Sequence, residues 1–444
     1  MLFKDIRIGF KEAYYQFNLP YYKNNVDIGF STQAMRADYQ KAFGSLLYAN
    51  LSGSRMPMPY PYENIYKLFE PQEELRILEI GARGLYFEHG VYKQIKMLDD
   101  KYGTDAKDRI MYAVLDISKP AIEKAKEEYK VYGRESFFDT EFFVADVLNN
   151  DEMKDVGKFK LVVMNELIDD IPHMVVTIKN KHYREIVFKP VYDENRAIIA
   201  FSKVGLRKLS KEDSDKLEAF CKLEEGKAIT FSPSLDGLIA NLSAHVERDG
   251  AFFIHDYFIR GPVDERRASI LRRIYGYEMP DILYEKKPGE KVQITADVNL
   301  SQLLFGLSKE GFDAVALPHQ VFINDMLGIK EVSLKEIAFS LNILHMDERI
   351  ELLKKLGRDV GDNASDKAVK KALLQEVNKI IRGSSNAKDS IILDKGAFNA
   401  PDHKIELRFV KSDEEKKEIL YETYRNSFGV KNPLMDVIAK IQAH

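Results

Sequence analysis

The sequence predicts an α/β fold built on a parallel, doubly wound sheet, and three observations lead to this prediction. From residue 75 onward, apolar runs of strand length alternate with amphipathic runs of helical length. The first apolar run, Ile77-Leu78-Glu79-Ile80, leads directly into Gly81-Ala82-Arg83-Gly84. An acidic or amide residue lies at the end of each of the first four predicted strands. Such alternation forms parallel sheets whose ligand sites lie at the carboxyl ends of the strands.

Composition limits the classes of protein that fit. The chain has 444 residues, of which 45% are hydrophobic and 31% charged, as in an ordinary globular protein with one enlarged domain or several. The net charge of -4 gives no reason to expect a nucleic-acid surface. The single cysteine, Cys221, excludes an internal disulfide and a multi-cysteine zinc site, and we expect no metal. The chain shows neither a run of ~20 apolar residues nor a signal-peptide core, so we expect a cytoplasmic protein without a membrane span.

An aromatic-rich arm, residues 1–70, precedes the first strand. Apolar residues recur at helical spacing from Thr32 to Leu51, with Ser31 or Thr32 as the N-cap. Pro57, Pro59 and Pro61 then end the helical pattern. We expect a helical lid, or a contact through which the chain forms a homodimer.

The main sheet is expected over residues 71–330. Ser118 and Pro120 open one of its helices as an N-cap and a first-turn proline. The last strand, 314–317, would finish the sheet in the antiparallel direction. The predicted strands are 77–80, 110–116, 140–146, 159–165, 251–257 and 314–317, and the predicted helices are 87–102, 118–129, 233–247 and 300–310.

Two parts of the chain depart from the alternation. Short β-branched runs at 174–178, 183–189 and 197–201 are separated by turn signals, so an antiparallel β-meander is inserted at about 173–230. Residues 331–444 form a mainly helical C-terminal extension. Its predicted elements are helices at 334–344, 347–356 and 368–381, a strand-like stretch at 405–410 and a closing helix.

The strand ends carry a candidate cofactor site. Asp116 could accept both hydroxyls of a ribose, and Asp146 could accept from the exocyclic amine of adenine. Glycines let the backbone approach a ligand closely. For each carboxylate alone, a helix N-cap is an equally good reading. The candidate cofactor residues are Glu79, Gly81, Gly84, Asp116, Asp146 and Asn165.

The glycine turn favours one kind of cofactor over others. It lacks the Gly-Lys-Ser/Thr of a phosphate-binding loop, and Arg83 stands where a dinucleotide fingerprint has glycine. These features favour a cofactor without a pyrophosphate, S-adenosylmethionine, over NAD.

The stretch from Asn165 to Pro172 is a candidate acceptor site. It places three carboxylates beside the cofactor, and a carboxylate can hold a guanidinium or ammonium group and take a proton. Glu166 and Asp169 are the candidates here, and the alternative is a capped turn that ends at Pro172.

A third candidate group ends the fifth strand at His255-Asp256-Tyr257. Neighbouring residues of a strand face opposite sides, so His255 and Asp256 cannot both reach one pocket. We therefore take Asp256 as the catalytic candidate and His255 as structural. The chain has no Gly-x-Ser-x-Gly motif, which argues against a hydrolase.

Several segments together resemble a known family. The sequence is similar to the MidA-like family, the mitochondrial complex I assembly factor 7-like S-adenosylmethionine-dependent methyltransferases. The matching segments follow the order of the family over roughly residues 15–330. They are Asp27–Thr32, Ile77–Ala82, Asn165-Glu166 with Asp169 and Pro172, Phe253–Tyr257, Ile294–Asn299, Leu303-Leu304, Gly311-Phe312, Gln320–Phe322 and Leu327–Ile329.

The resemblance implies a Rossmann-like methyltransferase fold with inserted elements, and methyl transfer to a protein side chain, with arginine favoured. It puts Gly81 and Gly84 in the cofactor loop and Asp116 at the ribose. It also puts Glu166 with Asp169 in an Asn-Glu-x-x-Asp-x-x-Pro signature, and Asp256 in an Asp-Tyr-Gly signature in which Phe258 here replaces the glycine.

Two alternatives remain open at this point. The glycine loop is one residue shorter than the family's, and the tail is long, which suggests a non-catalytic assembly or scaffold protein that binds S-adenosylmethionine. The other alternative is an NAD(P)-dependent oxidoreductase. Binding of nicotinamide cofactors would distinguish it from a methyltransferase.

Overall fold

The computed structural model describes residues 9–15, 19–24, 36–52, 66–69, 74–82, 84–192, 198–259, 261–264, 296–328, 346–361, 364–382 and 434–441. The chain divides into two compact units. The first comprises residues 1–316, 325–328 and 434–444, and the second comprises residues 317–324 and 329–433. All the sites discussed below lie within the first unit.

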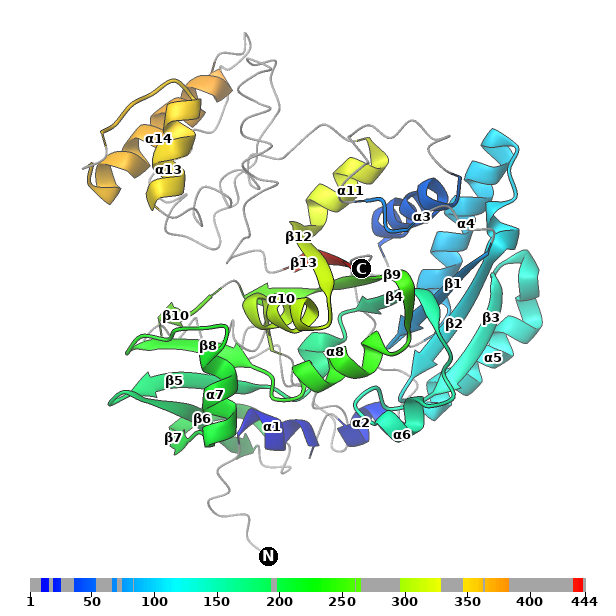
Figure 1. Ribbon diagram of the computed structural model, residues 1–444, viewed down its shortest axis with the longest axis horizontal. Helices are drawn as coiled ribbons and strands as arrows, with labels where there is room; N and C mark the ends of the chain where they lie inside the picture. The colour runs from blue at the N-terminus through cyan, green and yellow to red at the C-terminus, as the bar shows by residue number, and fades with distance from the viewer. Residues whose placement is uncertain are drawn as a thin grey trace, which may run out of the picture. The chain divides into compact units, whose positions relative to one another are not determined.

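A mostly parallel sheet forms the centre of the first unit (Figure 1). Its strand order is β12-β13-β9-β4-β1-β2-β3, with the short β11 beside β9. The neighbours from β9 to β3 all run parallel, which confirms the predicted α/β fold. The strands are β1 (Leu75–Ile80), β2 (Ile110–Asp116), β3 (Asp139–Val144), β4 (Phe159–Asn165), β9 (Val246–Ile259), β11 (Val298–Asn299), β12 (Phe312–Pro318) and β13 (Leu434–Ile441).

The central strands are apolar because both of their faces are covered. Every residue of β4 is buried, and Ile77 of β1 lies between Tyr112 of β2 and Leu161 of β4. Near-continuous apolar runs are typical of parallel strands that have helices on both sides. For this reason the apolar runs in the sequence predict where these strands lie.

The helices of the first unit include the four that the sequence predicts within residues 71–330, although the helix predicted at 118–129 extends to Tyr132. Ser118 Oγ accepts from the Ala121 N–H at 3.2 Å, which confirms it as the N-cap of α5. Gly103 ends α4 in the left-handed conformation, with φ of 66°. These helices are α1 (Phe10–Ala13), α2 (Leu19–Asn24), α3 (Ala37–Ser52), α4 (Tyr86–Tyr102), α5 (Lys119–Tyr132), α6 (Asn150–Met153), α7 (Lys211–Glu218), α8 (Leu235–Ser243) and α10 (Leu300–Lys309).

Helix α3 of the N-terminal arm is part of the hydrophobic core. Its Phe43 ring lies 5.3 Å from the ring of Phe87 on α4 and 5.0 Å from the ring of Phe253 on β9. Leu46 and Leu47 are fully buried. This helix therefore packs against α4 and β9 as part of the core. The predicted caps Ser31 and Thr32 lie outside the described residues.

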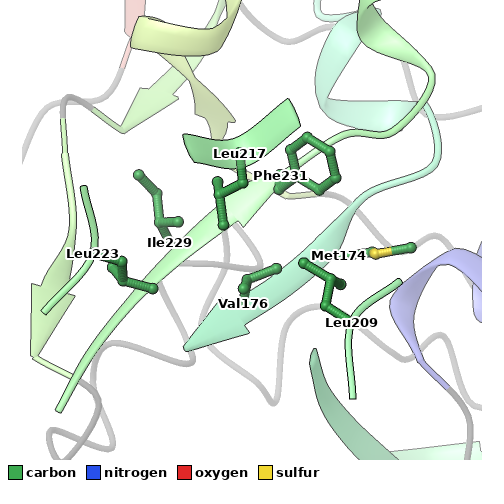
Figure 2. Packing of buried hydrophobic residues seen from close by; sticks show 7 residues of the cluster. All are labelled: Met174, Val176, Leu209, Leu217, Leu223, Ile229 and Phe231. Carbon is green, nitrogen blue, oxygen red and sulfur yellow. The ribbon is translucent and has the colours of Figure 1, made fainter. Parts of the chain in front are cut away.

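The inserted meander is a second, antiparallel sheet with the order β10-β8-β5-β6-β7. Its strands are β5 (Met174–Lys179), β6 (His182–Tyr192), β7 (Ile198–Lys208), β8 (Lys227–Phe231) and β10 (Val263–Asp264). Figure 2 shows its own small core, formed by Met174, Val176, Leu209, Leu217, Leu223, Ile229 and Phe231. The insert is thus an antiparallel meander, as its short β-branched runs and turn signals predict, and it has a small core of its own.

Two predicted elements need correction. The helix predicted at 233–247 ends at Ser243, and β9 begins at Val246. The antiparallel strand beside β9 is β13 rather than 314–317. The position of β13 in the sheet depends on its pairing with β9, which runs from Leu434↔Tyr257 to Lys440↔Ala251. The sequence places the closing helix after 405–410, and residues 411–433 lie outside the described residues. The predicted elements at 334–344 and 405–410 lie outside the described residues.

The second unit contains two described helices of the predicted extension, α13 (Met346–Lys355) and α14 (Asp366–Arg382). Arg349 on α13 pairs with Asp366 on α14 at 2.8 Å. Helix α11 (His319–Leu327) begins in this unit and ends in the first. None of the helices in the described parts of the chain is long and apolar enough to cross a membrane.

Candidate functional site

A cleft opens at the carboxyl ends of the parallel strands, where the chain order reverses between β1 and β4. Such a switch point is the usual ligand site of an open α/β sheet. The cleft has an empty volume of about 570 Å³, including the part open to solvent. It is lined by residues 80–81, 115–117, 145–148, 166–167 and 170–171, together with Tyr14 and Tyr22.

Gly81, directly after β1, has a backbone conformation and a lack of side chain that let a ligand approach the backbone closely. Its φ is +72°, its N–H donates to the Leu115 carbonyl at 2.8 Å, and a Cβ would lie 3.0 Å from Leu167 Cδ1. A side chain here would be strained by the backbone angle and crowded by that leucine. Gly84 has a φ of +139° with open space around it, and it is not among the lining residues.

Asp116 and Asp146 both line the cleft. Asp116 Oδ1 accepts from the Ser118 N–H at 2.8 Å, and Asp146 Oδ1 accepts from the Leu148 N–H at 3.0 Å. Each carboxylate thus holds its own turn through one oxygen while it faces the cleft. Holding the turn therefore does not prevent either carboxylate from facing the cleft.

Glu79 and Asn165 lie behind the cleft in a buried hydrogen-bond network. The Tyr112 hydroxyl donates to Glu79 Oε2 at 2.9 Å, and Asn165 Nδ2 donates to Glu79 Oε1 at 3.3 Å. The Tyr39 hydroxyl completes the network by donating to Asn165 Oδ1 at 2.8 Å. Burial raises the pKa of Glu79 to about 8 against these hydrogen bonds. The pair joins the ends of β1 and β4 but does not line the cleft.

Glu166 lines the cleft from a turn that Asp256 holds in place. Glu166 has a positive φ of 48°, and its N–H donates to the His255 carbonyl at 2.7 Å. Asp256 Oδ2 accepts from the N–H groups of Ile168 and Asp169 at 2.8 and 3.2 Å. Asp256 is fully buried and absent from the lining, so the structure gives it a supporting place rather than the mouth position that the sequence suggested.

Of the adjacent aspartates, Asp170 rather than Asp169 lines the cleft. Both lie in the single 3-10 turn of residues 168–170, where neighbouring side chains point about 120° apart. The Asp169 carbonyl instead accepts from the Ala296 N–H at 3.0 Å. Sequence reasoning missed Asp170 because the turn type, and hence the direction of each side chain, is not visible in the sequence.

Tyr14 and Tyr22 complete the lining from the N-terminal arm. Only 6% and 5% of their surfaces are exposed. Burial, followed by the nearby carboxylates of Asp146 and Asp170, raises the pKa of Tyr14 well above its usual value. The richness of the arm in aromatic residues was the signal in the sequence, although it did not single out these two.

His255 and Asp256 face different partners, as the strand geometry predicts. His255 Nδ1 lies 2.8 Å from Asp436 Oδ1 on β13, and its ring lies 4.7 Å from the Tyr39 ring. His255 and Asp436 are both fully buried. This pair belongs to the core of the sheet.

A protein-family model described as "Putative S-adenosyl-L-methionine-dependent methyltransferase" matches residues 62–316, more than half of the chain. The chain belongs to this family. The predicted resemblance to MidA-like methyltransferases is thereby confirmed, and S-adenosylmethionine is the cofactor. A search among curated proteins finds no match.

Solved structures give more distant similarity. A COG1565 superfamily protein from Burkholderia thailandensis, bound to S-adenosylhomocysteine, is 15% identical with a TM-score of 0.46, over 98% of this chain and 88% of its own. A second COG1565 structure from that organism is 14% identical with a TM-score of 0.45, over 98% and 87%. A methyltransferase from Methanosarcina mazei is 13% identical with a TM-score of 0.28, over 55% and 82%.

The cleft of the methyltransferase suits its cofactor. Asp116 offers a carboxylate at the end of β2 for a ribose diol, and Gly81 leaves the backbone open to close approach. No lysine, arginine or histidine is among the described residues that line the cleft. The family to which the chain belongs uses S-adenosylmethionine, and this sets the NAD(P) alternative aside.

Proposed function

We propose that this methyltransferase transfers a methyl group to an arginine side chain of a partner protein. The observation that carries the proposal is the charge of the cleft, where four carboxylates meet: Asp116, Asp146, Glu166 and Asp170. With no cationic residue among the described lining residues, this charge attracts a cationic acceptor and disfavours an anionic one.

The four carboxylates divide by their place in the fold. Asp116 and Asp146, at the ends of β2 and β3, would hold the cofactor together with Gly81. S-adenosylmethionine, when bound, supplies an electrophilic methyl group on a positively charged sulfur. Glu166 and Asp170, both after β4, remain for the acceptor.

Glu166 and Asp170 are suited to a guanidinium group. Two carboxylates on one turn can accept several N–H bonds from its planar fork, which orients one nitrogen for attack. That nitrogen would bond to the methyl carbon as the methyl–sulfur bond breaks and S-adenosylhomocysteine is left. The nearer carboxylate would take the proton that the nitrogen loses. Asp256 supports this arrangement because its carboxylate holds the backbone of the turn. Proximity and alignment would supply most of the acceleration.

The test is transfer of labelled methyl from S-adenosylmethionine to arginine-containing proteins, with binding of S-adenosylhomocysteine measured alongside. Glu166→Gln and Asp170→Asn are expected to lower transfer by about 100-fold while binding of the product persists. Asp169→Asn tests the neighbouring candidate from the sequence, which does not line the cleft. Asp116→Asn should instead weaken product binding by about tenfold or more.

Two results would overturn the arginine proposal. Labelling of a small molecule by an enzyme that leaves proteins unlabelled would move the acceptor to another class. If the wild-type protein bound S-adenosylhomocysteine but labelled nothing in extracts of its partners, a non-catalytic assembly protein would be the better description.

A further inference from the structure

Two short helices of the N-terminal arm link the insert sheet to the central sheet. We call residues 9–15 and 19–24, which contain α1 and α2, the N-terminal strap. Helix α1 packs beside β5 of the insert, and α2 packs beside α5, which covers the central sheet. Tyr14 and Tyr22 of the strap line the cleft. The strap therefore forms a wall of the cofactor site whose place depends on both sheets.

An arginine of the insert holds α1 in place. Arg207 on β7 lies across from Glu185 on β6, and its Nε and Nη2 donate to Glu185 Oε2 at 2.8 and 2.6 Å. The same Nη2 donates to Glu12 Oε1 of α1 at 2.6 Å. Glu12 Oε2 in turn accepts from the Gly9 N–H at 2.8 Å. We call Glu12, Glu185 and Arg207 the clasp.

The charges of the clasp make Arg207 the deciding member. Glu185 is buried, and burial raises the pKa of this carboxyl group while Arg207 opposes that rise. Without the guanidinium, the carboxylates of Glu12 and Glu185 would face each other and repel. Removal of Arg207 would therefore push α1 away from the insert sheet as well as delete a contact.

Gly9 shows how tightly the clasp is closed. A Cβ on this residue would overlap Glu185 Oε1 and lie 2.7 Å from Arg207 Nη2. Any side chain at position 9 must displace the clasp atoms, since those atoms fill the space. Gly9→Ala would thus open the clasp without changing its charges.

We propose that Arg207 is a positioning residue for the cofactor cleft, acting through Glu12 to hold Tyr14 against the bound cofactor and so slow its release. The insert sheet is then a working part of the methyltransferase site. The inference rests on the cofactor site of the family and not on the identity of the acceptor. Failure of the arginine proposal would leave it intact.

The absence of tryptophan from the chain gives a direct probe. Tyr14→Trp would place a single fluorescent indole at the cleft, where its emission should change when S-adenosylhomocysteine binds. In this background Arg207→Ala is expected to speed release of the ligand by about fivefold, the upper range for an exposed ion pair. Arg207→Lys should restore most of the loss, and Lys208→Ala, the exposed neighbour on β7, should leave release unchanged.

Gly9→Ala supplies an independent route and should speed release in the same direction. If the indole disturbs the fold, Arg207→Ala and Gly9→Ala can be titrated calorimetrically without the reporter substitution. Faster release would then appear as a weaker affinity for S-adenosylhomocysteine. Unchanged release in both variants, with only a lower unfolding temperature, would overturn the proposal and leave the clasp as a structural contact of the insert. A wild-type protein that bound no S-adenosylhomocysteine would refute the cofactor site itself.

Discussion

At the scale of single residues, Glu79 shows how the protein keeps a carboxyl group that water cannot reach. Its 2% exposed side chain accepts from Tyr112 and Asn165, yet burial outweighs these bonds and raises its pKa to about 8. The group is therefore protonated over most of the physiological range. It acts as a structural link between β1 and β4, one residue before the cleft begins.

This pKa makes stability depend on pH in a definite direction. Between about pH 4.5 and pH 8 the unfolded chain releases the Glu79 proton that the folded protein retains, so the free energy of unfolding falls as pH rises through this window. Glu79→Gln removes that titration. Urea unfolding at several pH values would measure this. Across the window, the free energy of unfolding of the variant should rise relative to that of the wild type by on the order of 3–5 kcal/mol.

Comparison with the wild type cancels the titration of groups that do not interact with Glu79. Glu88, whose pKa burial raises to about 8, is also raised by the nearby Glu79, so its titration belongs to the measured difference. Parallel stability curves for the two proteins would show that Glu79 ionises in the folded state near its ordinary pKa. The Gln side chain keeps the size of the group, so loss of packing would not explain a difference that grows with pH.

At the scale of elements, α5 begins where its side chains dictate. Ser118 is fully buried and caps the helix through Ala121, while Pro120 suits the first turn. Cap signals of this kind are local, which is why the sequence located the helix. Residues 434–441 show the opposite case, because their nearly continuous apolar run suits a helix or a buried strand equally.

The N-cap gives a prediction for the element. Ser118→Ala should lower the free energy of unfolding by about 1 kcal/mol, since the Ala121 N–H loses its partner. Chemical denaturation followed by circular dichroism would measure the loss. Ser234→Ala is the control, because Ser234 precedes α8 without making a side-chain cap bond. Equal losses in the two variants would contradict the assigned role of Ser118.

At the scale of the whole molecule, the end of the chain completes the central sheet. Strand β13 lies between β9 and β12, more than a hundred residues after the rest of that sheet. Asp436 on β13 pairs with His255 on β9, and neither side chain is exposed. The last strand thus contributes a buried polar contact to the sheet that carries the cofactor cleft.

Removal of that contact should be costly for the whole fold. Asp436→Ala leaves the buried His255 Nδ1 without this acceptor, and we expect a loss of about 3 kcal/mol in the free energy of unfolding. Asp436→Asn keeps an oxygen acceptor and should lose clearly less. Urea unfolding would measure the free energy of unfolding of the two variants. Equal losses would mean that the hydrogen bond to His255 contributes less than other properties of the Asp436 side chain.

The sequence alone determined the parts of this protein that depend on local pattern. Apolar runs located the parallel strands, cap residues located α5, and Gly81, Asp116, Asp146 and Glu166 were singled out because residues at the ends of parallel strands meet at one edge. Tertiary structure alone decided which side chains reach the cleft. Asp170 replaces Asp169 there, Glu79 and Asn165 lie behind it, Asp256 supports it, and Tyr14 and Tyr22 join it. The direction of a side chain in a turn, and the pairing of β13 with β9, depend on partners distant in sequence, which no local pattern contains.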